Sequence, residues 1–287
     1  MKKFLLLLAT AFLFALLTAC GGSDEGAEDN ANSGEGSDEE NTEIVVGASS
    51  VPHAEILEKA KPILEEKGIT LKVEEYQDYI LPNKDLDSGT LDANYFQHPP
   101  YLKAQEEEFG YDFVNLGGVH VEPMAIYSKN IKSVDDIKEG TDVIISRSEP
   151  DHGRILSLFE AAGLITLKEG VDKASATLED IAENPKNLNF SPDANAELLP
   201  QMYEKEQDAL VAINGNYAIE AGLSPVDDSI FHEGEDTPFP NVVVTRSEDK
   251  DSEALKTLVE VLQSDEIQTF IEEEYKGEIV PAPTSGE

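Results

Sequence analysis

Short apolar runs alternate along the chain with segments whose apolar residues recur every three or four positions. Runs of the first kind are typical of buried strands, and the second spacing is typical of amphipathic helices. The pattern predicts strands over residues 44–48, 70–76, 91–96, 113–116, 124–127, 142–145, 187–190, 209–213 and 241–245. It predicts helices over residues 53–67, 82–88, 99–109, 154–162, 176–181, 196–206, 252–263 and 265–273. This alternation predicts an α/β fold with parallel sheets and right-handed crossovers.

The alternating pattern restarts near residue 130, which predicts two lobes in series. The segment 241–245 resembles 124–127, so we expect the chain to return to the first lobe near its end. The first lobe is then expected to comprise residues 44–128 and 240–287, and the second lobe residues 129–239. Because ligands bind at the carboxyl ends of strands in open α/β sheets, we expect the site to lie between the lobes.

The N-terminus carries the pattern of an export signal. A short basic start precedes the apolar run 4–17, which is too short for a bilayer, since a spanning helix needs about 20 residues. Small residues then lead to Cys20, the only cysteine in the chain. This is the pattern of a bacterial lipoprotein signal. We expect a signal peptide over 1–19 and lipidation of Cys20, which would anchor the protein outside the cytoplasm on the membrane.

The distribution of charged residues characterises the segment that follows the signal peptide and the surface of the protein. Residues 20–43 contain nine acidic residues and no lysine or arginine, so this segment is expected to be a solvated tether that cannot bury enough apolar surface to fold. From residue 44 onward there are 50 acidic and 19 basic residues. That balance argues against nucleic acid as a partner, because phosphates would be repelled. We interpret acidic runs such as 106–108, 233–236 and 272–274 as solvated surface.

Arg154 is the first candidate for ligand binding, and it is one of only three arginines. It follows Gly153 at the predicted start of the helix 154–162, just after a strand, where ligands approach a parallel sheet. A guanidinium is a rigid two-pronged donor that matches a carboxylate, and a helix N-terminus would add positive potential. The pattern equally allows a surface arginine paired with Glu149 or Asp151.

Aromatic residues form a second candidate group at the end of the predicted strand 91–96. Phe96, His98 and Tyr101 could line an apolar pocket, and Tyr79 follows another strand on the same rim. A thioether packs well against the edges of such rings. The alternative is a core phenylalanine, a histidine that caps the next helix and a surface tyrosine, since aromatic residues are most often part of a core.

Two asparagines also stand at strand ends. Asn214 follows the strand 209–213, and Asn241 stands where the chain is expected to recross. Each amide can donate and accept hydrogen bonds, which suits the ammonium and carboxylate of an amino acid. As isolated turn residues they would be ordinary.

Signals for enzymatic activity are weak. The motifs GxSxG, HExxH and GxxxxGK do not occur, so the sequence lacks these nucleophile, zinc and phosphate signatures. The five histidines show no metal-ligand spacing. We therefore expect a binding protein, not an enzyme, with no metal and no cofactor.

Several motifs stand in the order found in the methionine-binding lipoproteins (MetQ/NlpA type), which are the extracytoplasmic binding subunits of ABC importers for methionine. They cover residues 47–57, 78–83, 91–98, 120–124, 183–188 and 213–218. The resemblance extends over residues 44–283. It implies a two-lobed periplasmic-binding-protein fold of type II with two crossover segments.

The resemblance also implies a set of ligand-binding residues. The residues expected around the methionine side chain are Tyr79, Phe96, His98 and Tyr101. The residues expected around the backbone ends of the ligand are Arg154, which would hold the α-carboxylate, Asn214 and Asn241, with Glu122 as a neighbour.

One departure from the family pattern lies directly before the arginine. The family usually has asparagine, a variable residue and glycine there, whereas this chain has Asp151, His152 and Gly153. The added carboxylate could weaken a carboxylate site, or it could form an ion pair that primes Arg154.

Together these observations predict a membrane-tethered receptor that captures L-methionine or a close analogue. It would deliver the ligand to an ABC transporter permease and through it to the ATPase. The alternative ligands are a methionine-containing dipeptide and another apolar amino acid. The alternative class is a surface interaction lipoprotein that takes no part in transport.

Overall fold

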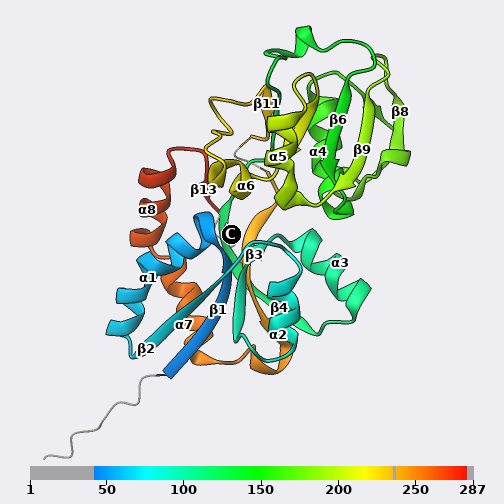
Figure 1. Ribbon diagram of the computed structural model, residues 1–287. Helices are drawn as coiled ribbons and strands as arrows, with labels where there is room; N and C mark the ends of the chain where they lie inside the picture. The colour runs from blue at the N-terminus through cyan, green and yellow to red at the C-terminus, as the bar shows by residue number, and fades with distance from the viewer. Residues whose placement is uncertain (1–41, 235–236, 283–287) are drawn as a thin grey trace, which may run out of the picture. The chain divides into compact units, whose positions relative to one another are not determined.

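The computed structural model describes residues 42–234 and 237–282 (Figure 1). The expected signal peptide, the lipidation site Cys20 and most of the expected tether 20–43 lie outside the described residues. Among the helices that are described, none combines the length and the apolar character that a membrane crossing requires.

Six strands form the sheet of the first lobe, in the order β13-β4-β12-β3-β1-β2. Their bounds are β1 Thr42–Ser49, β2 Ile69–Tyr76, β3 Ala93–Gln97, β4 Phe113–Val121, β12 Pro240–Arg246 and β13 Val280–Pro281. β1 runs parallel to both β2 and β3, whereas β12 runs antiparallel to β3 and β4. A strand from late in the chain therefore completes the centre of this sheet.

Helices cover both faces of this first sheet (Figure 1). On one face lie α1 Glu55–Glu66, α7 Glu253–Leu262 and α8 Asp265–Tyr275, and on the other lie α2 Leu81–Asp87 and α3 Pro99–Phe109. In β12, Val243 packs with the first group of helices, while Val242 and Val244 pack with the second. Because successive strand residues face opposite sides, covering both faces buries every central position of β12. This explains why Val242, Val243 and Val244 form a continuous apolar run in the sequence.

Five strands form the sheet of the second lobe, in the order β11-β5-β10-β6-β9. Their bounds are β5 Ala125–Tyr127, β6 Asp142–Ser146, β9 Asn189–Ala194, β10 Leu210–Ile213 and β11 Phe231–His232. Helix α4 Glu149–Ala161 covers one face, and α5 Leu199–Lys205 and α6 Gly215–Glu220 cover the other. The strands β7 Thr166–Leu167 and β8 Ile181–Glu183 pair as a separate small sheet.

The predicted α/β alternation and the two-lobed fold class are confirmed, and α3 has the predicted bounds. One strand was assigned to the wrong lobe, because β5 pairs with β10 and β11 in the second sheet. The chain therefore leaves the first sheet after Val121, earlier than the expected boundary after residue 128. A short apolar run predicts that a strand forms, but the neighbouring strand with which it pairs depends on backbone hydrogen bonds to residues far away in the sequence.

A second difference concerns α4, which begins at Glu149 and not at Arg154. Pro150 stands in its first turn, where the missing N–H of proline costs nothing. Arg154 consequently lies in the second turn of α4. The helix N-terminus therefore does not add the expected positive potential at Arg154, because the effect of the helix dipole falls off within the first turn.

The chain crosses between the two sheets twice. The first crossover, residues 122–124, joins β4 to β5. The second crossover, of which residues 233–234 and 237–239 are described, joins β11 to β12. Each crossover begins with a buried glutamate, Glu122 or Glu233. The two crossovers touch, because Met124 N–H donates to Glu233 Oε2 over 2.9 Å.

Candidate ligand-binding site

A small cavity lies between the two lobes. It is lined by Tyr79, Phe96, Gln97, His98, Tyr101, Glu122, Asp151, Arg154, Asn214, Gly215 and Asn241. Every candidate residue named from the sequence is in this set. The structure thus gathers into one place side chains that come from β3, α3, α4, β12, the first crossover and the end of β10.

Arg154 is buried at the base of the cavity, where it contacts both crossovers. Its Nε donates to Glu233 Oε1 over 3.0 Å, and its Nη2 donates to Glu233 Oε2 and, over 2.9 Å, to the carbonyl of Glu122. The guanidinium carbon lies 4.7 Å from the centre of the Phe239 ring. Within the described residues Nη1 makes no hydrogen bond, so its two N–H groups are free for a ligand.

The surroundings of Arg154 keep it charged. Burial by itself lowers the pKa of the guanidinium, and the charge and hydrogen bonds of Glu233 more than offset that, so the pKa lies above its ordinary value. The expected alternative, a surface arginine paired with Glu149 or Asp151, is wrong, because Arg154 is buried and its ion pair is with Glu233. Glu233 is likewise not part of a solvated acidic run, since only 8% of it is exposed.

Three aromatic rings form the apolar wall of the cavity. The Tyr79 ring centre lies 6.0 Å from that of Phe96 and 6.0 Å from that of Tyr101, and the centres of Phe96 and Tyr101 are 6.1 Å apart. Their mutual angles are those of tilted and edge-to-face pairs, which aromatic rings prefer. Such a wall is suited to an apolar or thioether side chain.

Hydrogen bonds hold the Tyr79 and Tyr101 rings and tie the lobes together. Tyr101 Oη donates to the carbonyl of Tyr79 over 2.8 Å, and Tyr79 Oη donates to Asn216 Oδ1 in the second lobe over 2.6 Å. Tyr217 Oη, also from the second lobe, donates to the carbonyl of Gln77 over 3.1 Å. The cleft is therefore bridged by direct contacts at its aromatic end.

His98 has two roles at once. Its Nδ1 accepts the N–H of Tyr101 and so caps α3, as the alternative interpretation of the sequence expected. Its Nε2 points across the cleft and donates to Asp151 Oδ1 over 3.1 Å. Asp151 is only 2% exposed, and its Oδ2 accepts from Asn214 Nδ2 over 3.3 Å. The aspartate that departs from the family pattern thus pairs with His98 and Asn214.

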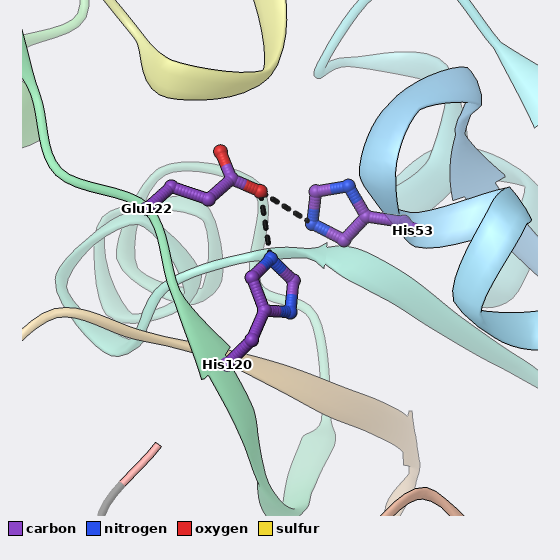
Figure 2. A group of neighbouring side chains, drawn as sticks. All are labelled: His53, His120 and Glu122. Atoms are coloured by element: carbon purple, nitrogen blue, oxygen red, sulfur yellow. Dashed lines mark hydrogen bonds and ion pairs between the residues drawn. The ribbon is translucent and has the colours of Figure 1, made fainter. Parts of the chain in front are cut away.

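Behind the cavity, Glu122 is held by two histidines (Figure 2). His120 Nε2 donates to Glu122 Oε1 over 2.8 Å, and His53 Nε2 lies 3.2 Å from the same oxygen and 3.1 Å from Asn241 Oδ1. Tyr95 Oη donates to His120 Nδ1, and the N–H of Asn216 donates to Glu122 Oε2 over 3.0 Å. Burial alone raises the pKa of Glu122, but the neighbouring His53 and the hydrogen bond from His120 bring it below its ordinary value.

Among the described residues, His53, His120 and Glu122 are also the one group with three donor atoms close enough to surround a metal ion, all within 4.8 Å of one another. The chemistry of the group favours a hydrogen-bond network instead. Glu122 Oε1 already accepts from His120, His53 Nε2 is hydrogen-bonded to Asn241 Oδ1, and His53 Nδ1 is buried without a partner among the described residues. A histidine that binds a metal, in contrast, usually donates through its second nitrogen. The network fixes the position of Glu122 at the cavity wall.

Three side chains in or next to the cavity were not predicted from the sequence as part of the site. Glu233 was interpreted as surface because it begins an acidic run, and Asp151 was noted only as a departure. Gln97 carried no signal; it is buried and donates to Asn83 and Asn94 Oδ1 over 2.8 and 2.9 Å. The scarcity of arginine could have prompted a search for a buried acidic partner of Arg154, because a buried charge must be paired.

The fold and the cavity define a class: two-lobed α/β binding proteins, in which a cavity lined by polar and aromatic side chains lies between lobes joined by two crossovers. The family model described as NlpA lipoprotein matches residues 44–283. The methionine-binding lipoprotein MetQ of Bacillus subtilis is 44% identical over 283 residues, which cover 98% of this chain and 99% of that protein. The chain therefore belongs to the NlpA lipoprotein family.

Solved structures agree with this assignment. A nutrient-binding protein from Burkholderia cenocepacia, solved bound to methionine, is 37% identical with a TM-score of 0.78, and the match covers 84% of this chain and 100% of that one. An ABC transporter periplasmic substrate-binding protein from Coxiella burnetii is 38% identical with a TM-score of 0.78, covering 83% of this chain and 100% of that one. These proteins share the two-lobed fold of the chain described here.

Proposed function

We propose that this protein is a receptor that binds L-methionine in the cavity between its lobes. The observation that carries the proposal is a buried, charged arginine with two free N–H groups that lies in the same cavity as a wall of three aromatic rings. The names of the relatives, which refer to methionine, support the same ligand. No bond is made or broken in this function.

In this proposal, separate groups of residues bind the side chain of methionine and its charged backbone groups. Arg154 Nη1 takes the α-carboxylate, and Tyr79, Phe96, His98 and Tyr101 surround the thioether side chain. Asn214 and Asn241 bind the backbone ends of the ligand, with Glu122 beside them. The Arg154–carboxylate pair is stronger in the bridged cleft than in open water, because the local dielectric constant is lower there.

Delivery and anchoring belong to the same proposal. Cleavage of 1–19 and lipidation of Cys20 would hold the protein on the outer side of the cell membrane, with 20–43 as the tether. An ABC permease would then recognise the ligand-bound form and carry methionine across the membrane, driven by ATP hydrolysis in the associated ATPase. Ligand contacts to both lobes would shift the population toward that form. A relative named as an ABC transporter substrate-binding protein supports this partner.

Mass spectrometry of small molecules that co-purify with the full-length chain tests the proposal directly. The expected result is methionine at close to one molecule per chain, released on unfolding and replaced by isotopically labelled L-methionine. Recovery of a methionine-containing dipeptide or of another apolar amino acid would change the assigned ligand, but the protein would still be a ligand-binding receptor. Absence of any bound amino acid, together with no calorimetric signal on adding methionine, would overturn the proposal in favour of a surface interaction lipoprotein.

A further inference from the structure

Asp151 places a second acidic group in the cavity besides Glu122. It stands in the first turn of α4 and reaches the cavity wall, where only 2% of it is exposed. Both of its oxygens are engaged, one by His98 of the first lobe and the other by Asn214 of the second. Asp151 therefore has a defined position in the site, unlike a solvated surface carboxylate.

The contact with Asp151 fixes which way the Asn214 amide points. A carboxylate only accepts hydrogen bonds, so Asn214 must present its NH₂ group to Asp151. Its oxygen, Oδ1, then has no partner among the described residues, although it is fully buried and Asn214 is only 7% exposed. A buried acceptor without a donor is costly, since an unmade hydrogen bond leaves the desolvation cost uncompensated. A ligand that donates at this point would remove that cost.

The charges of the cavity wall suit a cationic donor. Arg154 is already paired with Glu233, and the other two acidic groups of the wall, Asp151 and Glu122, accept hydrogen bonds from His98 and His120. Burial alone raises the pKa of the Asp151 carboxyl, but the hydrogen bond from His98 and the charge of Arg154 bring it below its ordinary value, so Asp151 is ionised at neutral pH. Glu122 has one oxygen, Oε2, that accepts only from Asn216 N–H among the described residues.

We propose that Asp151 is a specificity-determining residue that, together with Asn214 Oδ1, selects ligands carrying a primary ammonium group. Asp151 supplies negative charge and orients the Asn214 amide, and Asn214 Oδ1 accepts the hydrogen bond of the ammonium. This inference rests on the proposed function, since it assigns the amino end of the same ligand. It also gives the departure from the family pattern a role at the amino end of the ligand and not at its carboxylate.

A pair of ligands separates this role from a structural one. L-Methionine and 4-methylthio-2-hydroxybutanoate have the same thioether and carboxylate, but the second carries an uncharged hydroxyl in place of the ammonium. We expect the wild-type full-length chain to bind methionine about 100-fold more tightly, as loss of a hydrogen bond to a charged group implies. Asp151→Asn, which preserves shape but removes the charge, should reduce this preference about tenfold, mainly by weakening methionine binding.

The control is Glu149→Gln, which removes the same charge from the same turn of α4 at an exposed position; it should leave the preference unchanged. Titration calorimetry of both ligands gives the two affinities. If Asp151→Asn weakens both ligands equally, Asp151 is structural and the inference is overturned while methionine binding stands. Equal wild-type affinity for the two ligands overturns it without any variant. If wild type binds neither ligand, the proposed function itself fails.

Discussion

Arg154 is the residue at which the two crossovers meet. Its guanidinium bonds to the first crossover through the carbonyl of Glu122 and to the second through the carboxylate of Glu233. The remaining N–H groups on Nη1 are available to a ligand carboxylate. One side chain can therefore connect the ligand with both segments about which the lobes would move, which is a geometric basis for coupling binding to closure.

Replacing Arg154 should abolish most of the affinity for methionine. Arg154→Ala alone would leave Glu233 as a buried unpaired charge, so we pair it with Glu233→Gln to remove both charges together. The double variant should lose at least about 2 kcal/mol of binding free energy, roughly 30-fold in affinity, because the ligand carboxylate loses its charged partner.

Titration calorimetry measures that loss, with Arg147→Ala as the control because Arg147 is exposed and its guanidinium donates only to the carbonyl of Asp193 among the described residues. The control should bind methionine as wild type does. Unchanged affinity in a folded double variant would contradict the assignment of Arg154 to the carboxylate.

Phe96 should matter for the side chain of the ligand and little for its backbone. The ring is 4% exposed and packs against Tyr79 and Tyr101. Phe96→Ala is therefore expected to weaken methionine binding by a larger factor than it weakens glycine, measured by competition. Phe109→Ala, at a ring that is 52% exposed on α3, serves as the control. An equal loss for the two ligands would argue against an aromatic side-chain pocket.

At the scale of elements, the position of Arg154 depends on how α4 packs. Gly153, directly before Arg154, lies against the backbone of the short helical turn Lys173–Ser175. A Cβ on Gly153 would come within 2.5 Å of the Lys173 carbonyl oxygen and 2.6 Å of that of Ala174. Only glycine allows this close approach, so the sequence Gly-Arg sets both the packing of α4 and the location of the guanidinium.

Gly153→Ala should destabilise the protein even though alanine favours helix formation. Backbone atoms cannot rotate away as a side chain can, so the clash should cost about 1–3 kcal/mol of unfolding free energy, as overpacking does. Urea-induced unfolding measures this cost. Gly234→Ala is the matched control, because its added methyl group would meet no described atom within 4 Å. A Gly153→Ala variant as stable as this control would show that α4 can shift without penalty.

At the scale of the whole molecule, a buried neutral histidine makes stability depend on pH. Burial, aided by the neighbouring His120, lowers the pKa of His53 to about 4, despite the opposing effect of Glu122 and Asn241. In the unfolded chain His53 takes up a proton near its ordinary pKa of about 6.5. Between these values the unfolded state binds more protons than the folded state, so stability falls as the pH falls.

We expect His53 to account for about 3 kcal/mol of lost stability between about pH 6.5 and pH 4, since each pKa unit corresponds to about 1.4 kcal/mol. Denaturant unfolding across this range should show a shallower decline for His53→Gln than for wild type, while carboxylate titration is common to both. His232→Gln, at an exposed histidine, is the control and should follow wild type. Parallel curves for His53→Gln and wild type would contradict the assignment of a buried neutral imidazole.

The sequence by itself determined most of the longer elements, because each is encoded in local spacing. The predicted helix over residues 176–181 is wrong, since this segment holds the 3₁₀ turn Leu178–Asp180 and the start of β8. The apolar pattern predicted α3 with the bounds that the structure shows. The run Asn241–Thr245 correctly predicted a strand that returns to the first sheet. The ordered motifs were enough to predict the family, and all eight candidate side chains line one cavity.

Tertiary structure decided whatever depends on partners far along the chain. The sheet that Ala125–Tyr127 joins, the pairing of Arg154 with Glu233 across 79 positions, and the contact of Asp151 with His98 across 53 all arise from packing between segments far apart in the chain. Local sequence specifies a residue's backbone and its polarity. Which charge neutralises a buried arginine, and which way a buried amide points, follow only once folding has removed water and left a single set of neighbours.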